Sequence, residues 1–328
     1  MEQLYIGGYS DKGINICKFC NGKIESVSIS NPISNPSFLH LNNSILYAVL
    51  ENEKHNEEYG GGVAAFKINE NELQLINAKC TNGVAPCYLT TDKKREKLFV
   101  ASYGDGSICI HKLESSGEIG EIICEKKYNN AHMHFIKLMK NEQYVFMVDL
   151  GMDLIRIYKN GKEIEENSII KIEKKSEPRH FITSKDEKYL YLVTEHTNML
   201  YVYSMKDNTE IELIQKLSTL PINVKTESFA GAIKISKDEK YLYVSNRGHN
   251  SISVFSINNS KAELIQNISC GGDFPRDIAL NNTEEYMLVA NQKSNNVTVL
   301  KRNAENGKLS LTDEDFIVGN PACILFAD

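Results

Sequence analysis

The chain has 328 residues, of which 41% are hydrophobic, and a formal net charge of −6 at pH 7. This length allows a large hydrophobic core, and the negative charge disfavours a general nucleic-acid binder, which needs a basic surface. Because no run approaches the roughly 18 apolar residues that span a membrane, we expect no transmembrane helix. The first residues, MEQLYIGG, have the pattern of a strand and not of a signal peptide.

Three strands are predicted near the N-terminus, at Leu4–Gly7, Ile14–Phe19 and Ile24–Ile29. Repeats follow over most of the remaining chain. The clearest two copies are Ser184–Met205 and Ser236–Ile257, which carry nearly the same sequence at a separation of 52 residues. A period of this size in a strand-rich chain indicates stacked or radial repeats.

Six full copies of the repeat cover roughly residues 35–320. Each copy has an opening residue, a short first strand, a polar turn, an apolar second strand, a third strand and a variable fourth strand. The opening residues, including that of an incomplete last copy, are Pro36, Pro86, Met133, Pro178, Ala230, Pro275 and Pro321. The second strands are predicted at Leu46–Val49, Leu98–Ala101, Val145–Val148, Leu190–Val193, Leu242–Ser245 and Met287–Ala290. The third strands are predicted at Gly62–Ile68, Ser107–Leu113, Leu154–Lys159, Leu200–Met205, Ser251–Ile257 and Asn296–Arg302.

Two irregular segments lie inside the repeats. We interpret residues 51–62 (ENEKHNEEYGGG) as a long loop within one repeat. The segment Asn208–Gln215 has some helical character, but its place in the repeat predicts a fourth strand.

The two ends of the chain complete each other. Pro321–Ala327 is a first strand with no partners after it, whereas the three N-terminal strands lack a first strand. A shared terminal unit is what a closed ring requires, because closure removes the exposed sheet edges. We therefore predict an all-β fold, a seven-bladed β-propeller of four-stranded antiparallel blades, which forms a single domain over residues 1–328.

The upper rim of this ring is the predicted site. If the first strands run down the channel, the loops after the second strands and the openings of the first strands share that rim. The lower rim carries monotonous polar turns such as SKDEK, whereas the upper rim differs from blade to blade, as functional loops on a rigid scaffold do. The predicted upper-rim residues are Glu51, His132, Asp149, Arg179, His180, Glu195, Asn246, Arg247, His249, Arg276, Asn291 and Gln292.

This set of side chains favours a small anionic ligand. A single charged residue at a strand end is often solvated or part of a structural ion pair. Three arginines and three histidines on one side of a negatively charged protein are more specific, because guanidinium binds phosphate or carboxylate with two hydrogen bonds. Histidine can also move a proton near neutral pH.

The cysteines point to structure and not to chemistry. Cys17 and Cys20 form a CxxC pair beside a predicted hairpin, without a second pair or a helix that would lower a thiol pKa. Eight cysteines without a secretion signal are typical of reduced thiols. We therefore expect a cytoplasmic protein and interpret this pair as structural.

Several motifs resemble a known family. NPSFL, AHMH, VDLG, PRHF, STLP, YLYVSNRGHNSISVF, GGDFPR and VANQKSNNV resemble the lactonase family of seven-bladed propellers, typified by the cycloisomerase-type 6-phosphogluconolactonases. The resemblance runs from Tyr5 to Phe326. It implies hydrolysis of 6-phospho-D-glucono-1,5-lactone in the oxidative pentose phosphate pathway, in the cytoplasm, without a cofactor. The family's channel-mouth residues carry over to His132, Arg179, His180, Glu195, Asn246, Arg247, His249, Arg276, Asn291 and Gln292.

Roles follow from this resemblance as hypotheses. Arg247 and Arg276 bind the phosphate, with His249 nearby. Either His132 or Glu195 takes a proton from water, and Asp149 orients His132. Arg179 or His180 faces the oxyanion. One departure is Asn130, where the family often has histidine.

Two other readings remain open. The family includes relatives that act on muconate-type lactones, and a propeller can instead bind a protein partner across its rim. The rim carboxylates are outnumbered by Arg and His, which disfavours a hard divalent cation. A serine-hydrolase route lacks its GxSxG motif. We expect a phosphorylated sugar lactone as the ligand and a monomer or weak homo-oligomer.

Overall fold

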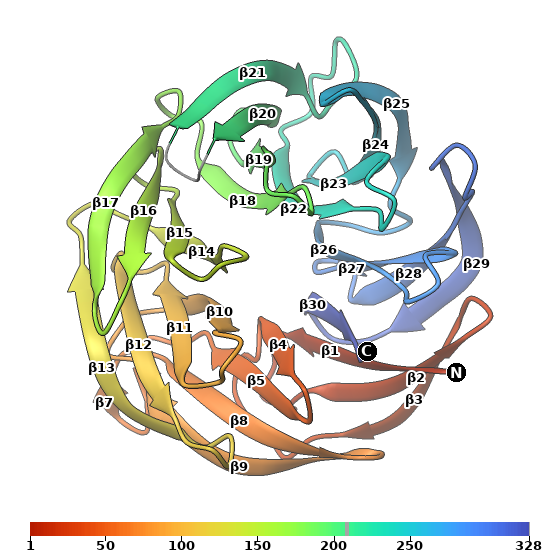
Figure 1. Cartoon of the computed structure of the whole chain (residues 1–328). Coiled ribbons are helices and arrows are strands. Elements are labelled where there is room, and N and C mark those ends of the chain that lie inside the picture. Colours follow the sequence, from red (N-terminus) through yellow and green to blue (C-terminus); the bar gives the residue numbers. More distant parts are fainter. Residues whose placement is uncertain (207–209, 328) are drawn as a thin grey trace.

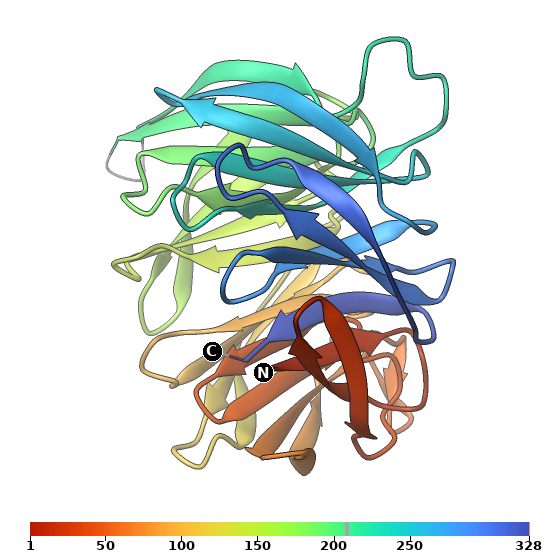
Figure 2. The same cartoon turned by 90° about the vertical axis from the view of Figure 1, so that its right-hand side faces the viewer.

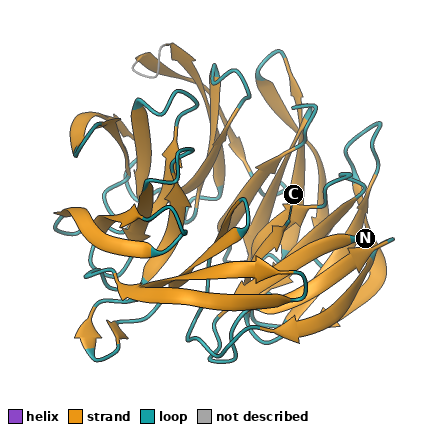
Figure 3. Cartoon of the chain, turned by 60° about the horizontal axis from the view of Figure 1, so that its bottom comes forward, coloured by secondary structure: helices purple, strands orange, loops and turns teal. Residues whose placement is uncertain are grey.

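The computed structural model describes residues 1–206 and 210–327. These residues form thirty strands and no helix. The strands are joined by loops and turns (Figure 3), and the sheets are arranged in a ring around a common centre (Figure 1). Among the described residues there is consequently no helix with the length and apolar character needed to cross a membrane.

Seven four-stranded antiparallel sheets make up the ring. From the innermost strand outward, the first three are β4 (Leu39–Asn42), β5 (Ile45–Leu50), β8 (Gly62–Asn69), β9 (Glu72–Cys80); β10 (Pro86–Thr91), β11 (Lys97–Ser102), β12 (Ser107–Leu113), β13 (Ile119–Lys127); and β14 (Met133–Leu138), β15 (Tyr144–Asp149), β16 (Leu154–Asn160), β17 (Ile164–Lys171). The next three are β18 (Pro178–Thr183), β19 (Tyr189–Thr194), β20 (Met199–Lys206), β21 (Glu210–Ser218); β22 (Phe229–Ile235), β23 (Tyr241–Arg247), β24 (Ser251–Asn258), β25 (Lys261–Ser269); and β26 (Pro275–Leu280), β27 (Tyr286–Asn291), β28 (Asn296–Arg302), β29 (Leu309–Ile317).

The seventh blade joins the two ends of the chain, as predicted. It consists of β30 (Pro321–Phe326), β1 (Glu2–Gly8), β2 (Asn15–Cys20) and β3 (Lys23–Ile29), with β30 innermost. The antiparallel register pairs Leu4 with Phe326 and Ile6 with Ile324. Both termini therefore lie next to each other on one face of the ring (Figure 1; Figure 2). The seven-bladed β-propeller expected from the repeat is confirmed.

The hydrophobic core lies between neighbouring blades. Its buried side chains form seven clusters, and each cluster draws on the facing strands of two adjacent sheets. The second and third strands are rich in β-branched and aromatic residues, which pack well on a pleated surface. Tyrosine and phenylalanine are the largest fully buried side chains, so they fill the space between blades in a chain that has no tryptophan.

Two irregular segments differ in detail from the prediction. The predicted long loop at residues 51–62 contains a short hairpin, β6 (Lys54–His55) with β7 (Glu58–Tyr59). Its tight turn has Asn56 and Glu57 in the left-handed region. The predicted strand Asn208–Gln215 corresponds to β21; its first two positions, 208 and 209, lie outside the described residues.

Candidate functional site

One residue of every blade forms a ring around the channel. It is the residue directly after the opening residue of the innermost strand, so the seven members occupy one repeat position. We call this set the channel ring: Ser37, Cys87, His134, Arg179, Gly231, Arg276 and Ala322. In six of the seven blades the register of the strand pair shifts at this position.

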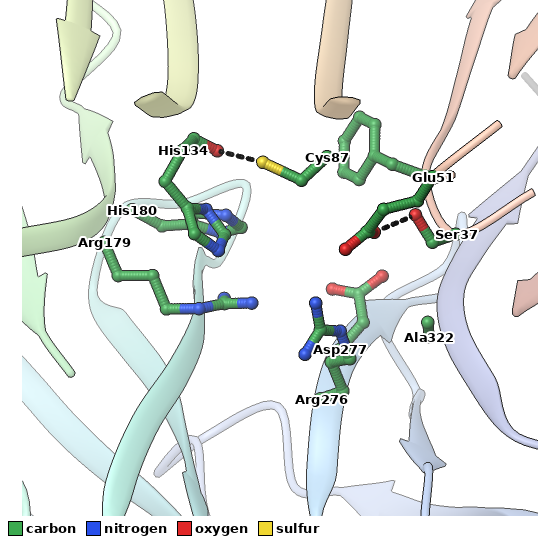
Figure 4. Close-up of a pocket in the computed structure, with 10 residues that line it drawn as sticks. Ser37, Glu51, Cys87, His134, Arg179, His180, Arg276, Asp277 and Ala322 are labelled. Carbon is green, nitrogen blue, oxygen red and sulfur yellow. Dashed lines mark hydrogen bonds between the residues drawn. The ribbon is translucent and has the colours of Figure 1, made fainter. Parts of the chain in front are cut away.

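A β-bulge re-aims the side chain of the extra residue, which is why bulges are common beside functional sites. Figure 4 shows the result, with ring residues from several blades facing one cavity. Gly231 is the exception, because a Cβ atom there would lie 2.7 Å from the Ser245 Oγ. Its carbonyl oxygen instead accepts a hydrogen bond from the Arg179 Nη1 at 2.9 Å.

Above the channel ring lies a cavity of about 270 Å³, which we call the mouth cavity. Its walls are Tyr9, Glu51, Cys87, Tyr103, His134, Glu195, Arg247 and Arg276. Below it the channel narrows to a pocket of about 20 Å³, enough for a single water molecule. Four residues line both spaces and therefore form the floor of the mouth cavity: Glu51, Cys87, His134 and Arg276.

Glu195 joins two arginines of neighbouring blades. One carboxylate oxygen, Oε2, lies 2.7 Å from the Arg247 Nη2 and 3.1 Å from the Arg179 Nε. Arg247 also donates to the carbonyl oxygens of Phe229 and Ala230 in β22. Burial opposes ionisation of Glu195, but the two guanidinium groups outweigh it and lower the pKa of this carboxyl. Glu195 is therefore ionised at neutral pH.

Burial and neighbouring charges also change the pKa of Arg179. Its side chain is 3% exposed. Burial, together with the nearby Arg247 cation, lowers the pKa of Arg179 to about 9. The group stays protonated at pH 7, held by Glu195.

Arg276 is the unpaired cation of the site. Among the described residues its guanidinium has neither an ion pair nor a hydrogen bond, and it lies 5.0 Å from the centre of the Tyr9 ring. The neighbouring carboxylate of Glu51 accepts hydrogen bonds from the hydroxyls of Tyr9 and Ser37. Burial lowers the pKa of Arg276, but Tyr9, Glu51 and Glu195 raise it by more. An anion that enters the mouth cavity thus meets one charged, uncommitted guanidinium.

His134 has a buried imidazole nitrogen without a hydrogen-bond partner among the described residues. The residue is 6% exposed, and this nitrogen is its Nδ1. Burial and the nearby Arg179, Arg276 and Arg247 cations lower the pKa of His134 well below its usual value. The imidazole is neutral at pH 7 and can accept a proton. The adjacent Cys87 thiol donates to the Met133 carbonyl oxygen at 3.4 Å, and burial raises its pKa.

The structure brings together five of the predicted residues around the mouth cavity and the narrow pocket. A sixth, Arg247, also lines the mouth cavity and pairs with Glu195; the five are Glu51, Arg179, His180, Glu195 and Arg276. The sequence reasoning missed His134, Cys87 and Ser37. Their signal was present, because they occupy the same repeat position as Arg179 and Arg276.

His132 and Asp149 lie apart from the two spaces. The His132 ring stacks on Tyr103 at 4.5 Å, and its Nδ1 lies 2.7 Å from the carbonyl oxygen of Tyr103. Asp149 accepts the backbone N–H of His132 and pairs with Arg156 at 2.9 Å, so its carboxylate does not contact the His132 imidazole. The predicted orienting contact is therefore wrong.

The remaining predicted residues make hydrogen bonds to residues that line neither space. Asn246 bonds to Thr219, Ser251 and Ser253, and Asn291 bonds to Thr298. Both asparagines are fully buried at the ends of second strands and point toward the third strand. The His249 Nδ1 lies 2.8 Å from the Ser251 Oγ, and Gln292 does not line either space. Their predicted role in substrate binding has no geometric support.

The thiols of the CxxC pair are both free, with Cys17 buried in the core. Within the described residues no group of three or more His, Cys, Asp or Glu side chains is placed to hold a metal ion.

Comparison with known proteins gives one family. The model of the family described as "Lactonase, 7-bladed beta-propeller" matches residues 3–326. An uncharacterized protein of Staphylococcus aureus is 32% identical over 99% of this chain and 100% of its own length. The 6-phosphogluconolactonase of Bacillus subtilis is 28% identical over 98% of this chain and 97% of its own length.

Solved structures agree on the fold. A putative 6-phosphogluconolactonase from Bacteroides fragilis has a TM-score of 0.91 at 25% identity, covering 100% of this chain and 98% of its own. A periplasmic gluconolactonase of Pseudomonas aeruginosa has a TM-score of 0.94 at 24% identity, covering 100% and 99%. The chain belongs to the lactonase family of seven-bladed β-propellers, which the sequence motifs had indicated.

Proposed function

We propose that the chain, as a member of this family, hydrolyses a sugar δ-lactone in the mouth cavity, and that its substrate is 6-phospho-D-glucono-1,5-lactone. This proposal rests on two groups that line the same cavity. Among the described residues the Arg276 guanidinium has no ion pair, and the neutral imidazole of His134 has a nitrogen without a hydrogen-bond partner. The cation provides an anion site, and the imidazole provides a proton acceptor. We further propose that the reaction takes place in the cytoplasm and belongs to the oxidative pentose phosphate pathway, and the family resemblance supports both.

The predicted phosphate site changes in one respect. Arg247 was expected to share the phosphate with Arg276, but its guanidinium is already bound by Glu195 and by two backbone carbonyls. We assign the phosphate to Arg276 alone among the arginines. Guanidinium offers phosphate two parallel hydrogen bonds, which fix both its charge and its orientation.

The chemical step needs only a base and an oxyanion donor. A water oxygen attacks the lactone carbonyl carbon while the imidazole of His134 accepts its proton. The carbonyl oxygen becomes an oxyanion that faces the buried Arg179 guanidinium, where one preorganised donor contributes roughly 3 kcal/mol. Collapse breaks the bond between that carbon and the ring oxygen. The ring oxygen takes the proton from His134 and leaves as a hydroxyl, and the product is the open-chain acid.

An unphosphorylated lactone is a second candidate because of the charge of the site. Three guanidinium groups and three carboxylates line the mouth cavity and the narrow pocket together, so their formal charges cancel. A site without net charge suits an uncharged lactone, whose polarised carbonyl needs no full counter-charge. No feature of the described site specifically favours the other two alternatives, a muconate-type lactone and a protein partner.

The test is hydrolysis of freshly generated 6-phosphogluconolactone and of gluconolactone, each measured against its spontaneous rate with and without chelator. We expect acceleration of the phosphorylated lactone that survives the chelator. Acceleration of gluconolactone alone would select the second candidate. If neither lactone reacts faster than the background, the proposed activity is wrong.

The pH dependence tests His134 as the base. Because its pKa lies well below 6.5, the imidazole stays deprotonated as the pH falls, and its basic form is lost only in more acidic solution. We expect kcat/KM, corrected for the spontaneous reaction and for ionisation of the substrate phosphate, to stay level as the pH falls through 6.5 and to decrease only in more acidic solution. A fall with an apparent pKa near 6.5 would point to an unperturbed histidine outside the buried cavity.

A further inference from the structure

A second cavity occupies the opposite end of the channel. It has a volume of about 190 Å³, and we call it the lower vestibule. Its walls come from the innermost strands beyond the channel ring, and they include Phe135, Lys137, Phe181, Ile233, Lys234 and Asp277. The volume exceeds that of the roughly 150 Å³ cavity that is known to hold a benzene ring.

An aromatic collar separates this vestibule from the mouth cavity. The collar consists of Phe38, Tyr88, Phe135 and His180, from four consecutive blades, with centroid distances of 4.2 Å, 4.6 Å and 5.0 Å along the series. Above the collar lies the narrow pocket of about 20 Å³. A sugar lactone cannot pass through a space of that size, so the two ends of the channel are separate binding spaces.

The vestibule combines apolar walls with one uncompensated positive charge. Lys234 lies 3.9 Å from Asp277, which also accepts the backbone N–H of Ile324. Lys137 has no ion pair or hydrogen bond within the described part of the chain; burial lowers its pKa, and the charge of Glu187 opposes this only in part. His180 adds no charge, because burial and Arg179 lower its pKa well below the usual value, and its Nε2 has no partner among the described residues.

Lys137 is half-buried, and its ammonium group would gain a charged hydrogen bond from a ligand that supplies the counter-charge. The walls beside Lys137 are the rings of Phe135 and Phe181 and the side chains of Ile182 and Ile233. They suit a flat apolar body, and the single excess charge suits a single negative charge.

We propose that the lower vestibule binds a small monoanion made of one planar apolar ring and one carboxylate. The carboxylate pairs with Lys137, and the ring lies against the aromatic collar and Phe181. This site is distinct from the proposed lactone site and does not depend on it. The benzoate ion is the simplest member of this chemical class.

Isothermal titration of the full chain with benzoate tests the proposal. We expect wild-type protein to bind benzoate, and Lys137→Met to weaken the binding about tenfold to a hundredfold, because a charged hydrogen bond contributes about 1.5–3 kcal/mol. Lys137→Arg keeps the charge and is expected to retain most of the affinity. Lys237→Met is the matched control, since Lys237 is an exposed lysine near the same end of the channel.

Benzyl alcohol and acetate separate the two parts of the ligand, and each should bind more weakly than benzoate. Thermal unfolding of every variant shows whether it is folded. The proposal is overturned if benzoate does not bind, or if Lys137→Met binds it as tightly as wild-type protein. Displacement of benzoate by 6-phosphogluconate, with loss of binding in Arg276→Met, would place benzoate in the mouth cavity and also overturn it.

Discussion

Replacing Arg276 with Met is expected to lower kcat/KM for 6-phosphogluconolactone about 100-fold, and to change that for gluconolactone by less than about fivefold. Arg276 is the one guanidinium of the cavity that lacks an ion pair or hydrogen bond among the described residues, so its interactions are available to the phosphate. Two charged hydrogen bonds at about 1.5 kcal/mol each amount to this factor. The loss should appear mainly as a higher KM, because the phosphate stays bound throughout the reaction.

Two control variants test whether the loss is specific to the Arg276 guanidinium. Arg276→Lys keeps the charge without the planar fork, and we expect an intermediate loss. Lys308→Met removes one positive charge from an exposed position and should leave both rates unchanged. An equal loss on both lactones in Arg276→Met would mean that Arg276 faces the reacting carbonyl and not the phosphate. No loss on either would remove Arg276 from the site.

The fold was predictable because the same sequence pattern recurs in every blade. Each blade has the same order of apolar strands and polar turns, and the incomplete copies at the two ends match the pairing of β30 with β1. The hairpin inside residues 51–62 was not predicted, since it occurs once and has no equivalent in the other blades.

The site was predictable only to the level of the rim. Residues at the end of a strand alternate between the channel and the neighbouring strand, and the bulge at the channel ring shifts that alternation by one residue. This explains why His134 reaches the mouth cavity whereas His132, two residues earlier, stacks on Tyr103. The same alternation turns Asn246 and Asn291 into their own blades. Sequence identifies the repeat position, but side-chain direction depends on a register shift that only the strand pairing reveals.

Replacing Glu195 with Gln is expected to lower the free energy of unfolding by about 3–5 kcal/mol at pH 7. The carboxylate lies between Arg179 and Arg247, whose side chains are 3% and 5% exposed, and it joins two adjacent blades. Glutamine has nearly the same shape but no charge, so two buried guanidinium groups would be left without a counter-ion. Urea unfolding of wild-type and variant protein measures the difference.

The sign of the pH dependence gives a second measurement. The pKa of Glu195 is lowered in the folded state, so its stabilising contribution is complete above the unfolded pKa of about 4.3 and is lost as the pH falls through the folded value. The gap between wild type and Glu195→Gln should therefore narrow in acid. Glu173→Gln is the matched control, because its pair with Lys216 is exposed to solvent and should contribute little to stability.

The same variant separates the two roles left open for this residue. If Glu195 holds the arginines, lost stability and lower activity should appear together, because Arg179 faces the oxyanion only while its partner fixes it. If Glu195 were the general base, kcat would fall about 10²–10⁴-fold in a variant of nearly normal stability. The second outcome would transfer the base from His134 to Glu195 and would contradict a purely structural role for this carboxylate. Unfolding and kinetics measured on one preparation therefore decide between a carboxylate that accepts protons and one that holds two cations in place.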